Sequence, residues 1–230
     1  MIMTETDAVP RTVLEGVERE TGALLEHMLR DFLDIDFQDH SVLGGVTTGG
    51  HVVTHLARGA DRMADELLAA TGRPAPLPDP GRQWDVETGG LRPGAVLIDD
   101  LHASADRLGD ALAGVGDWSA QGESIRAIPG RRLLQLVVHH ADLGRPWDEL
   151  PEEDAIAAAR LLPVVLGEEL AGIGIEVRPE LAGLEASAAD GGTTIVAASP
   201  RALLAWATGR TEGFGDSTSA MPRPRPRTWI

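Results

Sequence analysis

The sequence predicts a mainly helical α+β protein, in which a four-helix bundle is followed by a small α/β domain. Four segments between residues 11 and 143 carry apolar residues at helical spacing, and one long Pro-rich crossover interrupts them. From about residue 150 onward, helical segments alternate with short apolar runs that flank a turn signal. The chain has 230 residues, which is enough for two small domains. We place these domains at residues 1–148 and 149–230.

Apolar periodicity and helix-end signals define the four helices of the bundle. The first helix is expected over residues 11–35, and the second follows Thr48 as its N-cap and stops at Gly72. The third helix has Pro93 near its first turn. The fourth spans roughly residues 129–143, where the sequence GRP ends it.

The second domain is predicted to contain two helices and a β-hairpin. The helices are expected over residues 151–171 and 200–210, the latter with Gly209 at its stop. Two short apolar runs around the sequence DGG indicate the hairpin. The terminal sequence MPRPRPRTWI is predicted to be an extended tail, because its alternating prolines prevent regular structure.

Composition excludes several classes of function. The chain contains no cysteine, so it has neither disulfides nor a cysteine nucleophile, and any thiol chemistry needs a thiol from a cofactor or substrate. The net charge of −16 argues against nucleic acid as a partner. The sequence has no apolar stretch of membrane-spanning length and no secretory signal at its start, so we expect a cytoplasmic protein.

Two helical histidine clusters are the strongest candidates for chemistry. His51 and His55 share one face of the second predicted helix, while His139 and His140 end the fourth. Gln135 lies one helical turn before His139. One histidine from each helix plus an oxygen donor would make a three-ligand zinc-type site with an open position. Spacing alone does not settle this, because a histidine on an apolar helix face is more often a buried imidazole that is satisfied by hydrogen bonds.

Three stretches, in order, resemble the mycothiol-dependent maleylpyruvate isomerase family. They are HSVLGGVTTGGHVVTHLARGADRM, LLQLVVHHADLG and ALLAWATGR. The resemblance runs from about residue 12 to the terminal RTWI. It implies a DinB-like four-helix bundle, a small C-terminal α/β domain, a divalent metal (zinc) and mycothiol as thiol cosubstrate.

The resemblance also assigns site residues. The first metal histidine of the family falls on His55, in THLA. The Glu-x-x-x-His motif before DLG places its histidine on His139 and its glutamate on Gln135. The arginines that bind substrate correspond to Arg82 and Arg210.

This sequence departs from the family pattern at the proposed metal site. Gln135 replaces a carboxylate with a neutral amide, which weakens binding of a divalent cation. Val46 stands where the family has tryptophan, and an apparent one-residue insertion at TTGGH leaves the choice between His51 and His55 open. Asp142 would supply a carboxylate if the helix end unwinds; otherwise the site has lost its metal.

The resemblance implies a thiol-dependent isomerase or S-transferase that acts on a small electrophilic substrate with carboxylate groups. In such an enzyme, the metal holds the sulfur of mycothiol as a thiolate, which adds to an electron-poor double bond. Two alternatives remain open at the level of sequence. One is a diverged, metal-free member of the same fold that acts on a specialised metabolite, and the other is a protein that only binds a small molecule or partner.

Overall fold

The computed structural model describes residues 11–31, 37, 41–42, 47–74, 85–162, 165, 175–178, 185–188, 194–196 and 199–210. The chain divides into two compact units, Met1–Leu143 and Gly144–Ile230. Gly144, at this division, has a φ of 102°, a conformation that L-residues with a side chain rarely adopt.

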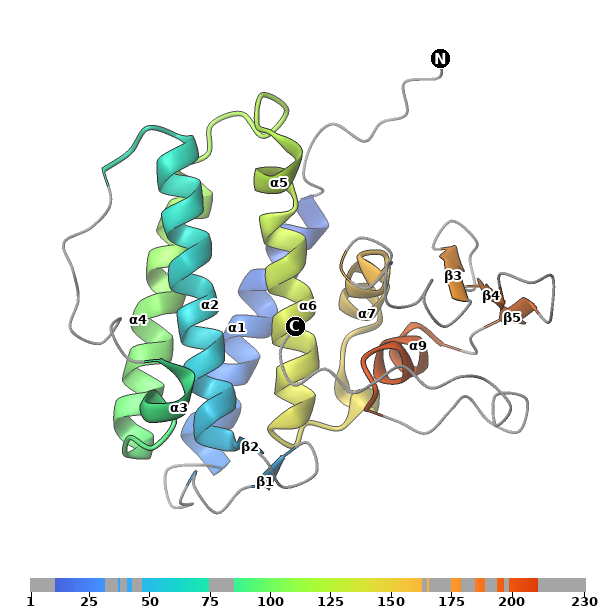
Figure 1. Ribbon diagram of the computed structural model, residues 1–230, viewed down its shortest axis with the longest axis horizontal. Helices are drawn as coiled ribbons and strands as arrows, with labels where there is room; N and C mark the ends of the chain where they lie inside the picture. The colour runs from blue at the N-terminus through green and yellow to red at the C-terminus, as the bar shows by residue number, and fades with distance from the viewer. Residues whose placement is uncertain are drawn as a thin grey trace. The chain divides into compact units, whose positions relative to one another are not determined.

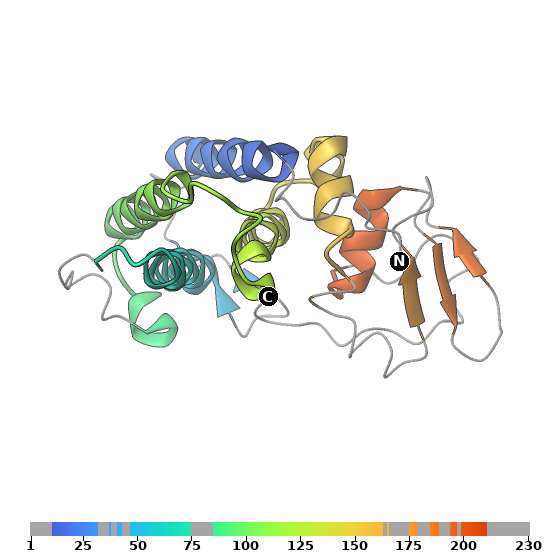
Figure 2. The same ribbon diagram turned by 90° about the horizontal axis from the view of Figure 1, so that it is seen from above.

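Four long helices build the first unit (Figure 1). They are α1 (Arg11–Asp31), α2 (Gly49–Ala70), α4 (Gly94–Ala113) and α6 (Ile128–Asp142). Helix α2 packs on α4 and α6, and α1 packs on α6 and α4. Figure 2 shows α2, α4 and α6 nearly end-on, with α1 crossing beside them. The bundle predicted from apolar spacing is therefore present, and no helix in the described part of the chain is long and apolar enough to cross a membrane.

The helix ends follow the local signals of the sequence. Thr48 is the N-cap of α2, and Gly72 follows the end of that helix with a φ of 66°. Pro93 occupies the N-cap position of α4. The first helix was expected to reach residue 35, but α1 ends at Asp31 and residues 32–35 lie outside the described residues.

Short elements connect these helices. The strands β1 (Ser41–Val42) and β2 (Thr47–Thr48) pair antiparallel, and the single-turn helices α3 (Val86–Gly89) and α5 (Glu123–Arg126) precede α4 and α6. Elements of two to four residues carry too few positions for an apolar period, so the sequence did not predict them.

The second unit combines short helices with a small sheet. Its elements are η3 (Trp147–Glu149), α7 (Glu152–Ala159), β3 (Ile175–Arg178), β4 (Glu185–Ala188), β5 (Thr194–Val196) and α9 (Pro200–Ala207). The strand order is β3-β4-β5, and both pairs are antiparallel. The predicted hairpin around DGG corresponds to β4 and β5. Helix α9 ends before Gly209, as expected, and Gly209 has a φ of 75°.

A network of buried charges links α2 to α4. Asp61, only 4% exposed, accepts hydrogen bonds from Nη2 and Nε of Arg107 at 2.6 and 2.9 Å. Arg58 Nη2 lies 3.3 Å from Asp61 Oδ2 and also pairs with Asp100. Asp100 accepts a further bond from Arg92 Nη2 at 2.6 Å. Each carboxylate of the network thus faces two guanidinium groups, so both buried negative charges are compensated by positive charges nearby.

We predict that Asp61→Ala lowers the free energy of unfolding by about 3 kcal/mol. The substitution removes the carboxylate that pairs with the partly buried side chains of Arg58 and Arg107. The control is Glu66→Ala, on the same helix. Glu66 pairs with Arg131 at 3.1 Å, but both side chains are 38% exposed, so its loss should cost at most about 0.5 kcal/mol. Urea denaturation measures both values, and equal losses would contradict a structural role for the buried network.

Candidate functional site

The contact between α2 and α6 brings His55 and His139 together. Their ring centroids lie 5.0 Å apart, and the rings are inclined by 75°. His139 is fully buried and His55 is 9% exposed, so the pair lies inside the bundle with limited access to solvent. Two of the three metal ligands expected from the sequence are therefore neighbours.

Gln135, the third expected ligand, lies one turn from His139 on the same face of α6. It packs against Gly59 of α2, where a Cβ would lie 3.0 Å from Gln135 Oε1. Gly59 lies one turn after His55 on α2, whereas its neighbour Gln135 lies one turn before His139 on α6. The two helices are consequently antiparallel here, and the missing side chain at Gly59 makes room for the carboxamide.

Asp142 fixes the orientation of the His139 ring. Its Oδ2 lies 2.8 Å from His139 Nδ1, and both side chains are buried. Helix α6 continues through Asp142, so this carboxylate reaches the ring without any unwinding of the helix end. A carboxylate that accepts the Nδ1–H of a histidine directs the other ring nitrogen, Nε2, toward a ligand, as in many metal sites.

His51 does not join this group but caps α2. The backbone N–H of Thr48 donates to His51 Nδ1 at 3.3 Å, and the Thr48 hydroxyl lies 2.7 Å from the same nitrogen. Gly90 packs so closely on His51 that a Cβ there would lie 2.8 Å from the His51 backbone. The structure therefore places His55, rather than His51, beside His139.

The adjacent His140 faces a different helix. Its Nε2 lies 3.0 Å from His27 Nδ1 on α1, and its Nδ1 lies 3.8 Å from Glu20 Oε2. Successive residues of a helix point about 100° apart, which explains why the two histidines contact different neighbours. Sequence reasoning missed this cluster. The available signal was a glutamate and a histidine seven positions apart on the first amphipathic helix.

Of the two expected substrate arginines, the structure describes only Arg210. Arg210 belongs to the second unit, where its backbone N–H donates to Ala205 O at 2.7 Å and its Nη1 donates to Thr208 O at 2.6 Å. It thereby closes the end of α9. Arg82 lies outside the described residues.

The donors beside the histidine pair suit a divalent ion that prefers nitrogen ligands, although their combined charge is low. Two imidazoles bound to one tetrahedral zinc ion, with Zn–N bonds of about 2.1 Å, have ring centroids about 5 Å apart, close to the spacing of His55 and His139. The described part of the chain contains no group of three or more His, Cys, Asp or Glu side chains placed to hold a metal. The third donor would be the neutral amide of Gln135, and Asp142 would offset the charge only through the His139 ring.

Residues 46–144 match the family described as the mycothiol maleylpyruvate isomerase N-terminal domain. This match covers a little less than half of the chain. The matched range contains α2 to α6, and with them the histidine pair, Gln135 and Asp142. The resemblance identified from the sequence is thus confirmed.

Known structures extend the likeness to most of the chain. The crystal structure of the mycothiol-dependent maleylpyruvate isomerase is similar with a TM-score of 0.65 and 21% identity, over 94% of this chain and 95% of that one. A mutant of the isomerase with one histidine replaced by alanine gives the same TM-score at 20% identity and the same coverage. No curated protein matches the chain. At this identity, the likeness establishes a shared, mainly helical fold.

We predict that His51→Ala lowers the free energy of unfolding by about 1 kcal/mol, because the N-terminus of α2 loses its side-chain cap. The control is His102→Ala on α4. The His102 side chain is 61% exposed and pairs with exposed Asp106 at 3.2 Å, so this change should cost at most about 0.5 kcal/mol. Thermal and urea unfolding test both variants, and an unchanged stability of His51→Ala would contradict the capping role.

Proposed function

We propose that the protein is a thiol-dependent isomerase or S-transferase of the mycothiol type, acting on a small electrophilic substrate with carboxylate groups. The observation that carries this proposal is the buried contact between His55 and His139, with Gln135 and Asp142 beside it. All four residues lie within the segment that matches the isomerase-domain family. The cosubstrate would be mycothiol, and the metal a divalent ion such as zinc.

Three side chains would hold the metal. His55 and His139 would bind it through ring nitrogens, with His139 using the nitrogen that does not face Asp142, and Gln135 would bind through its carboxamide oxygen. A bound ion would supply a positive charge that lowers the pKa of the mycothiol thiol and keeps it deprotonated at neutral pH.

The remaining tasks fall to the protein itself. Asp142 holds the ring of His139 in one tautomer and one orientation through the 2.8 Å contact. Burial of both imidazoles limits water at the site, which strengthens every electrostatic interaction there. Because the chain has no cysteine, the nucleophilic sulfur has to come from the small thiol.

The substrate carboxylates would be bound by Arg82 and Arg210. A guanidinium group presents parallel N–H donors that match the two oxygens of a carboxylate. Support for these two assignments comes from the sequence motifs PGRQWDVETG and WATGR alone.

The specific observation that favours a second candidate is the neutral donor set. With Gln135 in place of glutamate, no carboxylate directly offsets a metal charge, and the described residues offer no three-member His, Cys, Asp or Glu group. The second candidate is therefore a metal-free member of the fold that uses the same site for a specialised metabolite, as an enzyme or only as a binding protein.

We predict that zinc-loaded protein turns over maleylpyruvate, or couples an electrophilic acceptor to sulfur, only when mycothiol is present. His55→Ala and His139→Ala should each lower kcat/KM by at least about 100-fold, because each removes a ligand of the thiolate-bearing ion. His51→Ala is the matched control. It should retain activity, because His51 is on the same helix but contacts the cap residue Thr48 and not His139. Turnover is measured by following the loss of substrate absorbance and the consumption of free thiol.

Absence of turnover in the presence of zinc and mycothiol would count against the thiol-dependent reaction. Unchanged activity of His139→Ala would also contradict the assigned site. Thiol-dependent turnover that needs no metal, yet is lost in both histidine variants, would favour the metal-free candidate.

A further inference from the structure

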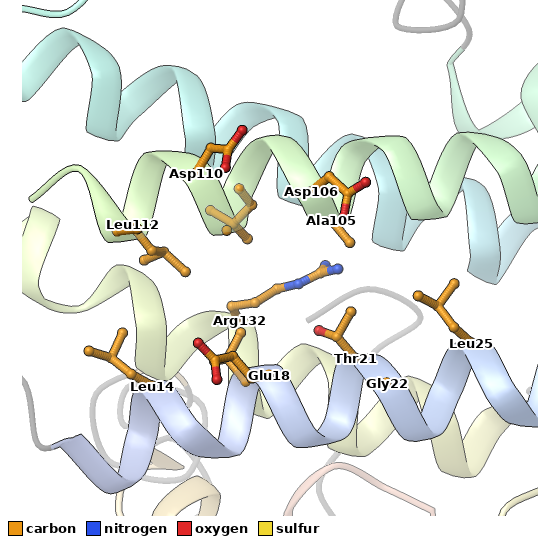
Figure 3. Close-up of a pocket in the computed structure, with 14 residues that line it drawn as sticks. Leu14, Glu18, Thr21, Gly22, Leu25, Ala105, Asp106, Asp110, Leu112 and Arg132 are labelled. Carbon is orange, nitrogen blue, oxygen red and sulfur yellow. The ribbon is translucent and has the colours of Figure 1, made fainter.

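A cavity of about 690 Å³ lies between α1 and α4, with Arg132 of α6 reaching into it (Figure 3). Apolar side chains make up much of its lining, from α1 and α4: Leu14, Val17, Leu25, Leu108 and Leu112. Neither the histidine pair nor Gln135 lines this cavity. Its volume falls within the range of about 300–1,000 Å³ that is usual for small-molecule sites.

Arg132 is the unusual group of this cavity. It is 1% exposed, and its Nη1 donates to the backbone oxygen of Leu56 at 2.8 Å. Among the residues that the structure describes, no hydrogen-bond partner lies at its buried Nε and Nη2 atoms. Figure 3 shows the guanidinium group directed between Thr21 of α1 and Ala105 of α4, inside the cavity. Nε and Nη2 form one edge of the guanidinium fork, which matches the two oxygens of a carboxylate.

The charged groups that the structure describes near Arg132 do not bind the edge formed by its Nε and Nη2 atoms. Burial lowers the pKa of Arg132 to about 10, while the negative charge of Asp61 acts in the opposite direction, so the side chain stays protonated at neutral pH. Asp61 makes its own ion pairs with Arg58 and Arg107. A buried cation with unsatisfied donors disfavours folding, and such residues are typical of binding sites rather than of cores.

The mouth of the cavity carries the opposite charge. Glu18, Asp106 and Asp110 line it, and all three are exposed at the surface. A ligand that reaches Arg132 with its anionic end would leave any second negative charge close to these carboxylates. The cavity therefore selects against dianions.

We propose that this cavity binds a small monocarboxylate with an apolar body, whose carboxylate accepts hydrogen bonds from Nε and Nη2 of Arg132. The leucine-rich walls contact the apolar body, and the acidic rim excludes a second carboxylate. The site is separate from the histidine pair, so it does not depend on the thiol-dependent function proposed above.

Isothermal titration calorimetry of the full chain with octanoate, octanol and octanedioate tests the proposal. Octanoate is expected to bind with a stoichiometry of one. Octanol, which lacks the charge, and octanedioate, which carries a second one, should each bind at least about tenfold more weakly. Undetectable binding of octanoate, or equal affinities for octanoate and octanol, would overturn the proposal.

Two kinds of variant assign the binding to this cavity. Arg132→Met keeps an unbranched apolar side chain and removes the guanidinium group with its charge, and should reduce octanoate affinity to that of octanol. Gly22→Leu and Gly109→Leu fill the cavity from two walls, and a Cβ at either glycine meets nothing within 4 Å. Both changes raise helix propensity, so these variants should fold and yet lose octanoate binding.

Gly116→Leu is the matched control, because a Cβ at Gly116 also meets nothing within 4 Å and Gly116 does not line the cavity. It should bind octanoate as the unmodified protein does. Octanoate binding that survives both Gly22→Leu and Gly109→Leu would place the ligand elsewhere and overturn the proposal, whatever the stability of Arg132→Met.

Discussion

The close approach of α2 and α6 at Gly59 is the constraint on which the candidate site depends. A Cβ at this position would lie 3.0 Å from Oε1 of Gln135, which is tighter than an ordinary contact, so the carboxamide would have to shift. Because α2 and α6 are antiparallel and have the same number of residues per turn, the contact of Gly59 with Gln135 also brings His55 next to His139, one turn away. Asp142 lies three residues further along α6, where it reaches the second nitrogen of the His139 ring. A single helix-helix contact thus brings together the four residues of the candidate metal site, His55, Gln135, His139 and Asp142.

The interior of the bundle also holds charges, and their surroundings separate structural roles from binding roles. Arginines compensate the negative charges of Asp61 and Asp100, and these ion pairs link α2 to α4. Arg132 is buried more deeply than these arginines, its side chain lies in a cavity, and two of its nitrogens have no hydrogen-bond partner in the described part of the chain. The first arrangement stabilises the fold. The second disfavours folding, and its most direct explanation is a ligand with a carboxylate.

The long helices could be predicted from the sequence because their apolar spacing and their ends obey local rules. Thr48, Gly72, Pro93 and Gly209 each lie at or next to a helix end, as expected. The choice between His51 and His55 could not be predicted, because both share one helical face and an apparent insertion obscured the register. The structure separates them, because His51 is held by the local cap at Thr48, whereas the packing of α2 on α6 brings His55 to His139.

Buried polar residues were the main features that the sequence did not reveal. Arg131 and Arg132 are identical neighbours in sequence, yet Arg131 pairs at the surface with Glu66, while Arg132 points into the bundle. The approach of His27 and Glu20 to His140 likewise depends on how α1 packs on α6. Local patterns carry no information on which of two polar neighbours faces the interior, since that depends on residues far away in the sequence.

Metal content, measured by mass spectrometry on protein purified without a histidine tag, tests the central claim most directly. The account predicts a stoichiometric amount of zinc or a similar divalent ion in the unmodified protein, and tighter binding in Gln135→Glu, where a carboxylate replaces the amide. An unmodified protein without metal would contradict the account. If Gln135→Glu then bound metal, the absence of metal in the unmodified protein would be due to the missing carboxylate. The metal-free candidate would then replace the mechanism with a metal-bound thiolate.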